Sequence, residues 1–266
     1  MASRKKPRDG KLIYVIPDAQ VKPGHSVAYL RAIGLHIMSK RPDIIVCLGD
    51  FADMPSLSSW DRKKLQFEGR RYRQDVNATK KAMEALLGPI REHNLGKPPE
   101  EQYRPRLVMT LGNHEDRIGR FVADNPELEG HLSVADLGYE GYGWEVVPFL
   151  EPIVIEGIVF CHYLTSGVMG RPITTAAAIL QKRHMSAVVG HQQGRMVHDQ
   201  VAADGRQLRA IIAGSCYEHD EDYLGPQGNK HWRGVVLLHA VKDGEFIEQF
   251  VTIRHLKRKY REQIGE

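Results

Sequence analysis

Long apolar runs are absent from this chain of 266 residues: none approaches the roughly 18 residues that a membrane-spanning helix needs. The N-terminal segment MASRKKPRDGK is basic and polar, and the apolar run that follows, Leu12 to Ile16, is too short for a signal peptide. Cysteine is also scarce, since Cys47, Cys161 and Cys216 form no CxxC pair and are odd in number. These absences predict a cytoplasmic protein with buried, reduced thiols and no membrane partner.

A strong charge of either sign is lacking too. The formal net charge is +4 and 26% of the residues are charged, which is ordinary for a soluble protein. Lys and Arg nevertheless gather in three segments, residues 1–11, 61–73 and 254–261. Such clusters attract polyanions, but they are equally typical of solvated tails and helix faces. Both interpretations stay open at this level.

What the chain does have is an alternation of strand-like and helical segments. Eight apolar runs have the length and composition of strands: 12–16, 44–49, 107–112, 158–162, 187–191, 210–214, 235–240 and 246–253. Four segments have helical periodicity: 26–39, 73–94, 116–124 and 174–184. The alternation in the first half predicts parallel βαβ units, and the second half is richer in strands. The fold class is therefore α/β.

Several of these strands end in residues that bind metals. Asp18, Asp50, the NHE segment 113–115, His162 and His191 each follow an apolar run. In open α/β sheets, ligands gather beyond the carboxyl ends of the strands. We therefore expect these side chains to converge on one place.

The motifs PDAQ (17–20), LGDFAD (48–53), LGNHEDR (111–117), FCH (160–162) and GHQQG (190–194) follow one another in this order. The set resembles the calcineurin-like metallophosphoesterase superfamily, whose pattern is DxH, GD, GNH[D/E], a lone H and GHxH. LGNHE is its most specific piece. The resemblance implies a four-layer α/β/β/α sandwich with two mixed sheets and helices outside. It would form one domain over residues 1–266, with a basic helical insertion at about 54–105 and a basic C-terminal tail at about 254–266.

The resemblance also implies a centre of two divalent cations, which lie roughly 3.5–4 Å apart in such enzymes and activate water for attack on phosphorus. Asp50 would bridge both cations. The second position would add Asn113, His162 and His191, all of which are present. The glycines before Asp50, Asn113 and His191 suit tight turns that aim these side chains inward.

The first position departs from the family pattern. It would take Asp18, Asp50 and two histidines, but this chain has Gln20 and Gln193 in place of the histidines. Glutamine carbonyls can bind cations, and an all-oxygen site favours Mg²⁺, Mn²⁺ or Ca²⁺ over Zn²⁺. We interpret the position as rebuilt, with Mn²⁺ as the first expectation and Mg²⁺ or another transition metal as alternatives. The competing interpretation is that this position is lost and one cation remains.

Further ligands could come from His25 or from the acidic run at 218–223, although a helix-start histidine and a solvated loop are the simpler interpretations. By resemblance, His114 assists the leaving group. It then needs a carboxylate partner to act at neutral pH, and Asp53 is one candidate. Arg117 either contacts a phosphate oxygen or is an exposed helix arginine.

The substrate is constrained by one absence: the GDxxDRG signature of protein phosphatases is replaced by GDFADMPS. The excursion after Asp50 interleaves aromatic and basic residues: Trp60, Arg62, Lys63, Lys64, Phe67, Arg70, Arg71, Tyr72 and Arg73. This mixture suits single-stranded DNA or RNA, a lid over a smaller diester, or a homo-oligomer contact. The leading hypothesis is a metal-dependent phosphodiesterase, with a nuclease as one form of it, in which a metal-bridging hydroxide attacks in line. The alternatives are a small-molecule phosphomonoesterase and a nucleic-acid-binding protein with a degraded metal centre.

Overall fold

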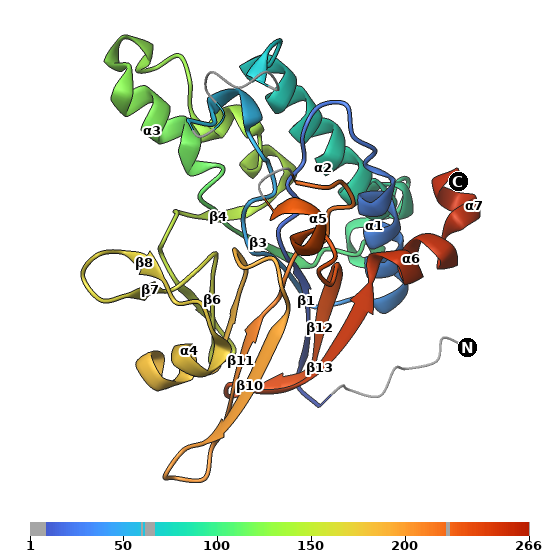
Figure 1. Ribbon diagram of the computed structural model, residues 1–266. Coiled ribbons are helices and arrows are strands. Elements are labelled where there is room, and N and C mark those ends of the chain that lie inside the picture. Colours follow the sequence, from blue (N-terminus) through green and yellow to red (C-terminus); the bar gives the residue numbers. More distant parts are fainter. Residues whose placement is uncertain (1–8, 60, 62–66, 222–223, 266) are drawn as a thin grey trace.

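The computed structural model describes residues 9–59, 61, 67–221 and 224–265, and Figure 1 shows their arrangement. Six strands form the first sheet, in the order β13 (Glu245–Thr252), β12 (Gly234–Lys242), β1 (Lys11–Ile16), β2 (Ile44–Cys47), β3 (Arg106–Thr110) and β4 (Glu145–Val147). The strands β1 to β4 are parallel, with Ile13 beside Ile44 and Ile45 beside Leu107, whereas β12 and β13 are antiparallel. The first sheet is therefore mixed, and its parallel half comes from the first half of the chain, as predicted.

The second sheet comes from the middle of the chain. Its order is β10 (Met196–Val201), β11 (Gln207–Ile212), β9 (Ala187–Val189), β6 (Ile158–Cys161) and β5 (Ile153–Ile155), with parallel pairing of β11, β9 and β6. A small hairpin, β7 (Thr165–Ser166) and β8 (Arg171–Pro172), follows β6. The chain is thus a mixed α/β protein with two multi-stranded mixed sheets.

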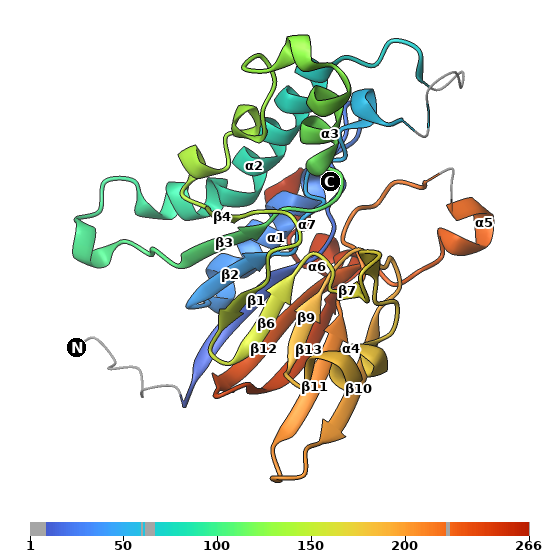
Figure 2. The same ribbon diagram turned by 90° about the vertical axis from the view of Figure 1, so that its left-hand side faces the viewer.

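Alternation along β1 divides the core. Leu12, Tyr14 and Ile16 pack in the cluster that includes α1 (Ala28–Lys40) and α2 (Tyr72–Asn94), while Ile13 and Val15 pack in a cluster that includes strands of the second sheet. This is the period-two pattern of a strand that is buried on both faces. Figures 1 and 2 show α1 and α2 on the outer side of the first sheet.

The outer face of the second sheet carries α4 (Ala176–Arg183). Ile179 and Leu180 of this helix pack in a third cluster with Val159 and Cys161 of β6. Thr175 caps the helix by accepting a hydrogen bond from the backbone N–H of Ala178, and Lys182 and Arg183 occupy its last turn. The helix with its two caps therefore lies within the predicted range 174–184.

The segment 54–105 contains a 3₁₀ turn, η1 (Pro55–Leu57), and the long α2, which is the crossover between β2 and β3. Helix α2 packs closely on α1, where a Cβ on Gly34 would lie 2.2 Å from the Leu86 carbonyl oxygen. The buried face of α2 includes Met83 and Leu86. Most of this segment therefore belongs to the helical layer over the first sheet.

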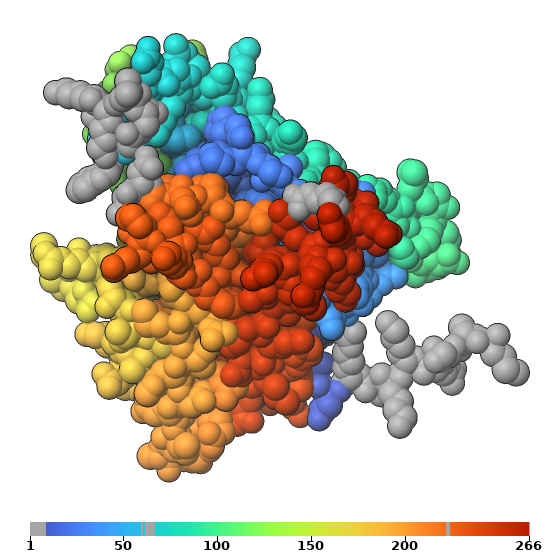
Figure 3. All heavy atoms as spheres, turned by 45° about the vertical axis from the view of Figure 1, so that its right-hand side comes forward, coloured from blue at the N-terminus to red at the C-terminus, as the bar shows by residue number. Residues whose placement is uncertain are grey.

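The basic C-terminal segment is folded as well. It forms α6 (Ile253–Lys259) and α7 (Arg261–Ile264), and Ile253, Leu256 and Tyr260 are buried in the core that includes α1. Figure 3 shows these helices, in red, lying against the strands that precede them. The cationic side chains of this segment are one face of a packed helix.

All eight predicted strands and four predicted helices are confirmed, including α3 (Asp116–Asp124). The sequence pattern missed β4 and β5, which have three residues each, and β10, whose six residues are all exposed and show no apolar alternation. It also missed α6, α7 and the single-turn α5 (Gly225–Gly228). No described helix is both long and apolar enough to cross a membrane. The three cysteines are free and buried, as predicted.

Candidate metal centre

Five loops at the carboxyl ends of strands meet at one end of the two sheets. They carry the predicted residues Asp18 after β1, Asp50 after β2, Asn113 after β3, His162 after β6 and His191 after β9. The loops are joined by backbone pairing, since Gln20 N donates to the Asp50 carbonyl (2.8 Å) and Gly190 N donates to the His162 carbonyl (2.9 Å). The predicted convergence is therefore observed, and it draws on both sheets.

Asp50, His162 and His191 form the tightest part of the cluster, because one ligand atom from each lies within 4.8 Å of the others. His162 Nδ1 lies 2.8 Å from the Leu48 carbonyl oxygen, to which it donates a hydrogen bond. That bond leaves Nε2 facing Asp50 Oδ2 at 3.3 Å and Asn113 Oδ1 at 3.0 Å, and in the neutral form of the ring this nitrogen carries a lone pair. Three electron-pair donors that face one another need a cation or a proton between them.

The pKa values in this cluster also indicate that a positive charge is needed there. Burial lowers the pKa of His162, but the adjacent Asp50 carboxylate outweighs it and raises this pKa to about 9. Burial opposes ionisation of Asp50, yet His114 and His162 hold its pKa below its usual range. Burial and the neighbouring His162 lower the pKa of His191 to about 4. At neutral pH the cluster thus combines an ionised Asp50, a neutral His191 and a proton on His162 that a divalent cation would displace.

The first position lies around Asp18, which is fully buried. Its Oδ1 accepts a hydrogen bond from His191 N (3.1 Å), and its Oδ2 lies 3.4 Å from Gln193 Nε2. Burial, with a smaller contribution from the Asp50 carboxylate, raises the pKa of Asp18 to about 7. Two buried carboxylates that repel each other in this way are stabilised by a positive charge placed between them.

Gln20 and Gln193 test whether this position suits a metal. Both side-chain carbonyl oxygens are buried, and neither has a hydrogen-bond partner among the described residues. An unpaired buried carbonyl is costly, and native proteins usually satisfy such groups. Gln193 directs its Nε2 at Asp18, and rotation of the amide would bring Oε1 to that side. Cation binding would then satisfy both oxygens, so the donor set of Asp18, Gln20, Asp50 and Gln193 fits a hard, oxygen-preferring cation.

The backbone is strained where these side chains are presented. Gln20 (φ 40°), Asp50 (φ 46°) and His191 (φ 67°) all adopt left-handed conformations that residues with a Cβ rarely take. Each such residue costs on the order of 1–3 kcal/mol, and such strain clusters at functional sites. Three of the seven predicted ligands are therefore held at an energetic cost by the surrounding structure.

The three glycines serve two different purposes. Gly49 has φ +84° and forms the tight turn that the sequence predicts. Gly112 and Gly190 are needed for space, because a Cβ would lie 2.1 Å from Asp50 Oδ1 at Gly112 and 2.5 Å from Asp18 Oδ1 at Gly190. Neither of these two has a positive φ. The expected tight turn is therefore confirmed at Gly49 and corrected to a close approach at the other two.

Glu115 entered the sequence analysis only as part of the NHE segment, and its role was missed. It is fully buried, and its carboxylate accepts hydrogen bonds from Asp50 N, Ala52 N and Gly112 N at 2.9 Å each, and from the Tyr139 hydroxyl at 3.1 Å. Glu115 thus ties the loop after β2 to the loop after β3. Its place in LGNHE next to His114 was the available signal.

His114 stands beside the centre with a carboxylate partner. Its Nδ1 lies 2.7 Å from Asp53 Oδ1, its backbone N–H donates to Asp50 Oδ1 (2.9 Å), and its Nε2 lies 3.6 Å from Asp50 Oδ2. Burial lowers the pKa of His114, but Asp50 and Asp53 outweigh it and raise this pKa. Among the candidate partners, the structure selects Asp53.

Arg117 is not an exposed helix arginine. Its Nη2 lies 3.1 Å from His114 Nε2, and its Nη1 donates to the Asp53 carbonyl oxygen at 2.7 Å. Its side chain is only 20% exposed. A guanidinium at this place can meet an anion that enters the centre beside His114.

The remaining candidates have partners of their own. His25 packs against His219 with the rings tilted and their centroids 4.6 Å apart, and Glu221 of the acidic run pairs with Lys22 and His219. Of the aromatic and basic excursion, Trp60, Arg62, Lys63 and Lys64 lie outside the described residues, as do Asp222 and Tyr223 of the acidic run. Arg70 lies over the Phe67 ring and pairs with Asp61 at 2.9 Å.

Comparison with known proteins adds distant relatives. No family model matches the chain. It is 26% identical over 197 residues to the protein called Gene 54 protein in Mycobacterium phage D29, and equally so to the Gene 54 protein of Mycobacterium phage L5. The match covers 71% of this chain and 72% of each relative. These names describe no activity, so the functional argument rests on the site itself.

Proposed function

We propose that this protein is a metal-dependent phosphodiesterase of the calcineurin-like metallophosphoesterase type. One observation carries the proposal: metal-binding side chains from five strand ends of two sheets meet around Asp50, with the His114–Asp53 pair beside them. Structural ion pairs rarely combine strained backbone, unpaired buried carbonyls and a histidine–carboxylate pair in one place. The three separate cores support the finer expectation of a four-layer α/β/β/α sandwich.

Two divalent cations, with Mn²⁺ the first expectation, would supply an activated water and neutralise charge on the phosphoryl oxygens. Asp50 would bridge them. Asn113, His162 and His191 would hold the second cation, and Asp18, Gln20 and Gln193 the first. The Leu48 carbonyl holds the His162 ring in the orientation that this requires.

The side chains beside the cations would act on the substrate. His114 is placed to protonate the leaving oxygen through Nε2, while Asp53 fixes the ring and its tautomer through Nδ1. Arg117 now contacts His114 Nε2 and would move its contact to a phosphoryl oxygen when substrate enters. Breaking the scissile bond in this way needs no covalent intermediate with the protein.

The direct test measures initial rates on bis(p-nitrophenyl) phosphate and on p-nitrophenyl phosphate, with Mn²⁺, with Mg²⁺ and with a chelator. Wild type is compared with Asn113→Ala, and Asn77→Ala, an exposed site on α2, is the matched control. We expect Mn²⁺-dependent cleavage of the diester that is lost with the chelator and in Asn113→Ala. Nucleic-acid substrates then decide whether the enzyme is a nuclease.

Two results would replace this proposal. Faster cleavage of the monoester would identify a phosphomonoesterase. Salt-dependent binding of single-stranded nucleic acid without any turnover, with less than one Mn²⁺ bound per chain, would identify a binding protein with a degraded centre.

A further inference from the structure

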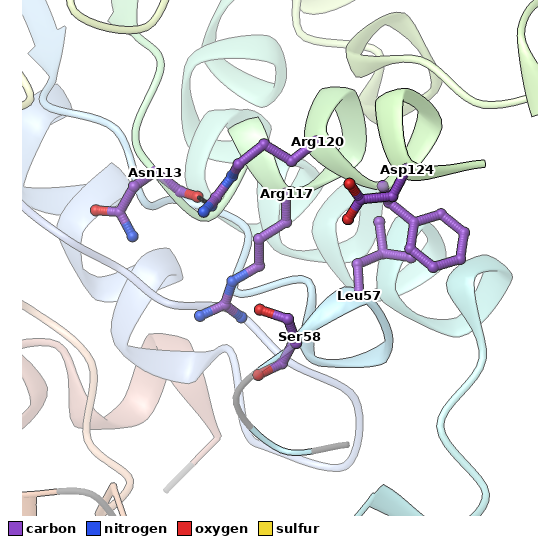
Figure 4. Close-up of a pocket in the computed structure, with 8 residues that line it drawn as sticks. Leu57, Ser58, Asn113, Arg117, Arg120 and Asp124 are labelled. Atoms are coloured by element: carbon purple, nitrogen blue, oxygen red, sulfur yellow. Dashed lines mark hydrogen bonds between the residues drawn. The ribbon is translucent and has the colours of Figure 1, made fainter. Parts of the chain in front are cut away.

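A cavity opens directly beside the candidate metal centre. It has a volume of about 280 Å³ and lies between η1 and α3 (Figure 4). Asn113 lines it on the side of the centre, and Leu57 and Ser58 line it on the side of η1. This volume is just below the roughly 300–1,000 Å³ of pockets for drug-sized ligands, so the cavity suits one substituent of a larger substrate.

One face of α3 forms the opposite wall. Arg117, Arg120, Phe121 and Asp124 all line the cavity, and their spacing of three, four and seven residues places them on the same side of the helix. The helix buries Ile118 in the protein core on another side. The face that turns to the cavity thus combines two cations, an aromatic ring and a carboxylate.

The cavity lies on the side of the leaving group. Arg117 lines it and also contacts His114 Nε2 at 3.1 Å, the atom placed to protonate the leaving oxygen. The part of the substrate beyond that oxygen therefore extends along Arg117 into the cavity. This step rests on the proposed function.

Arg120 is held at the mouth of the cavity. Its Nη2 donates to the Asn113 carbonyl oxygen at 2.7 Å and its Nε pairs with Asp116 at 2.9 Å, so the guanidinium lies between the candidate metal ligand and solvent. Figure 4 shows the two arginines coming from the same helix, with Arg117 reaching toward Ser58 and Arg120 toward Asn113. Two guanidinium groups at successive depths suit two anionic groups of one ligand.

The inner wall suits a flat ring with polar edges. Leu57 and Phe121 offer apolar surface for the face of a ring, and the Asp124 carboxylate can accept a hydrogen bond from an amine at its edge. A nucleobase with its phosphates has groups that can pair with the carboxylate and the two arginines, whereas a lipid chain offers none. We propose that the cavity binds the leaving nucleotide of a nucleic-acid or oligonucleotide substrate, with Arg120 pairing with the phosphate that follows that nucleotide.

A binding experiment tests this without turnover. Adenosine monophosphate and adenosine 3′,5′-bisphosphate are titrated by calorimetry into wild type, Arg120→Gln and Arg120→Lys, with Arg104→Gln, an exposed arginine outside the cavity, as control. Wild type and the control should bind the bisphosphate about 10-fold more tightly than the monophosphate, because a charge-assisted hydrogen bond to the second phosphate is gained. Arg120→Gln should abolish this difference, and Arg120→Lys should keep part of it.

A kinetic experiment separates this inference from the proposed function. The ratio of kcat/KM for a phosphorylated dinucleotide to kcat/KM for bis(p-nitrophenyl) phosphate should fall about 10-fold in Arg120→Gln. Diester turnover with no preference for the bisphosphate in wild type would overturn the nucleotide pocket and leave the phosphodiesterase intact. A preference that depends on Arg120, without turnover of any diester, would support the pocket and overturn the activity.

Discussion

The two halves of the candidate centre share Asp50 but are built differently. The second position presents two imidazoles and an amide oxygen beside Asp50. His162 Nε2 lies 3.3 Å from Asp50 Oδ2 and 3.0 Å from Asn113 Oδ1, and the Leu48 carbonyl fixes the orientation of that ring. The first position presents carboxylates and two glutamine carbonyl oxygens that have no partner among the described residues. The orientation of His162 in the second half is fixed by a hydrogen bond, whereas Gln20 in the first half is held by its left-handed backbone.

This difference predicts unequal affinity for cations. Imidazole ligands hold transition metals firmly, whereas neutral carbonyl oxygens bind hard cations more weakly and exchange them more readily. We expect one tightly bound and one exchangeable cation. Equal affinity for cations at both positions would contradict this expectation.

The largest effect is expected from His162→Ala, which removes a central ligand of the second position. Changes next to a metal ligand already cost about 10–100-fold in affinity, so loss of the ligand should weaken the tight cation by more than about 100-fold. Calorimetric titration with Mn²⁺ measures this, and His198→Ala, an exposed strand histidine, is the control. Retention of the tight cation in His162→Ala would place it elsewhere.

Substitution of the two glycines that lie against metal-site carboxylates should affect the two cation positions differently. Gly112→Ala would push on Asp50 and Gly190→Ala on Asp18, and each overpacked site should destabilise the fold by about 1–3 kcal/mol. Gly112→Ala should weaken both cations, and Gly190→Ala chiefly the exchangeable one. Gly119→Ala in α3 is the control, because its added Cβ meets no atom within 4 Å. Thermal unfolding and Mn²⁺ titration give the two readouts, and identical metal losses in both variants would argue against two distinct positions.

The double variant Gln20→His and Gln193→His should make the halves more alike. Two imidazoles at the first position should raise affinity for Zn²⁺ relative to Mn²⁺ by about 10-fold or more. Competition between the two metals, monitored by elemental analysis after dialysis, measures the change. Gln200→His on the exposed β10 serves as the control. An unchanged preference would mean that the glutamines do not face a cation.

The smallest effect is expected from His36, a histidine outside the centre. Its protonation limits the stability of the fold at acid pH, and with it the pH range in which the two positions can be compared. Burial, together with the charges of Lys40, Lys259 and His255, lowers the pKa of His36 to about 4, and its Nδ1 lies 2.9 Å from the Tyr14 hydroxyl. The folded state therefore holds the neutral ring, and its stabilisation is complete above about pH 6.5 and is lost as the pH falls toward 4.

At pH 5.5 the loss of folding stability from this group is about 1 kcal/mol relative to neutral pH. Urea unfolding at several pH values in the presence of chelator would detect it. His36→Gln should flatten the dependence between pH 6.5 and 4. If His36→Gln leaves the slope of stability against pH unchanged, the acid sensitivity belongs to other groups.

Much of this molecule is determined locally by the sequence. The eight predicted strands and four predicted helices are present because their apolar periods and caps are local signals. The polar residues at five strand ends also predicted which side chains would meet, because ligands gather beyond the carboxyl ends of strands in α/β proteins. Short strands such as β4 and the fully exposed β10 carry no such signal, so their formation was decided by the tertiary structure.

Only the tertiary structure decided how the site is assembled. Asp53 as the partner of His114, Glu115 as the tie between two loops, and the cavity face of α3 all depend on contacts between segments that lie far apart in the chain or across a turn. The orphaned carbonyls of Gln20 and Gln193 likewise result from burial, which no spacing of residues reveals. A sequence specifies which groups are available, but the free energy of burying and pairing them is set by the fold as a whole.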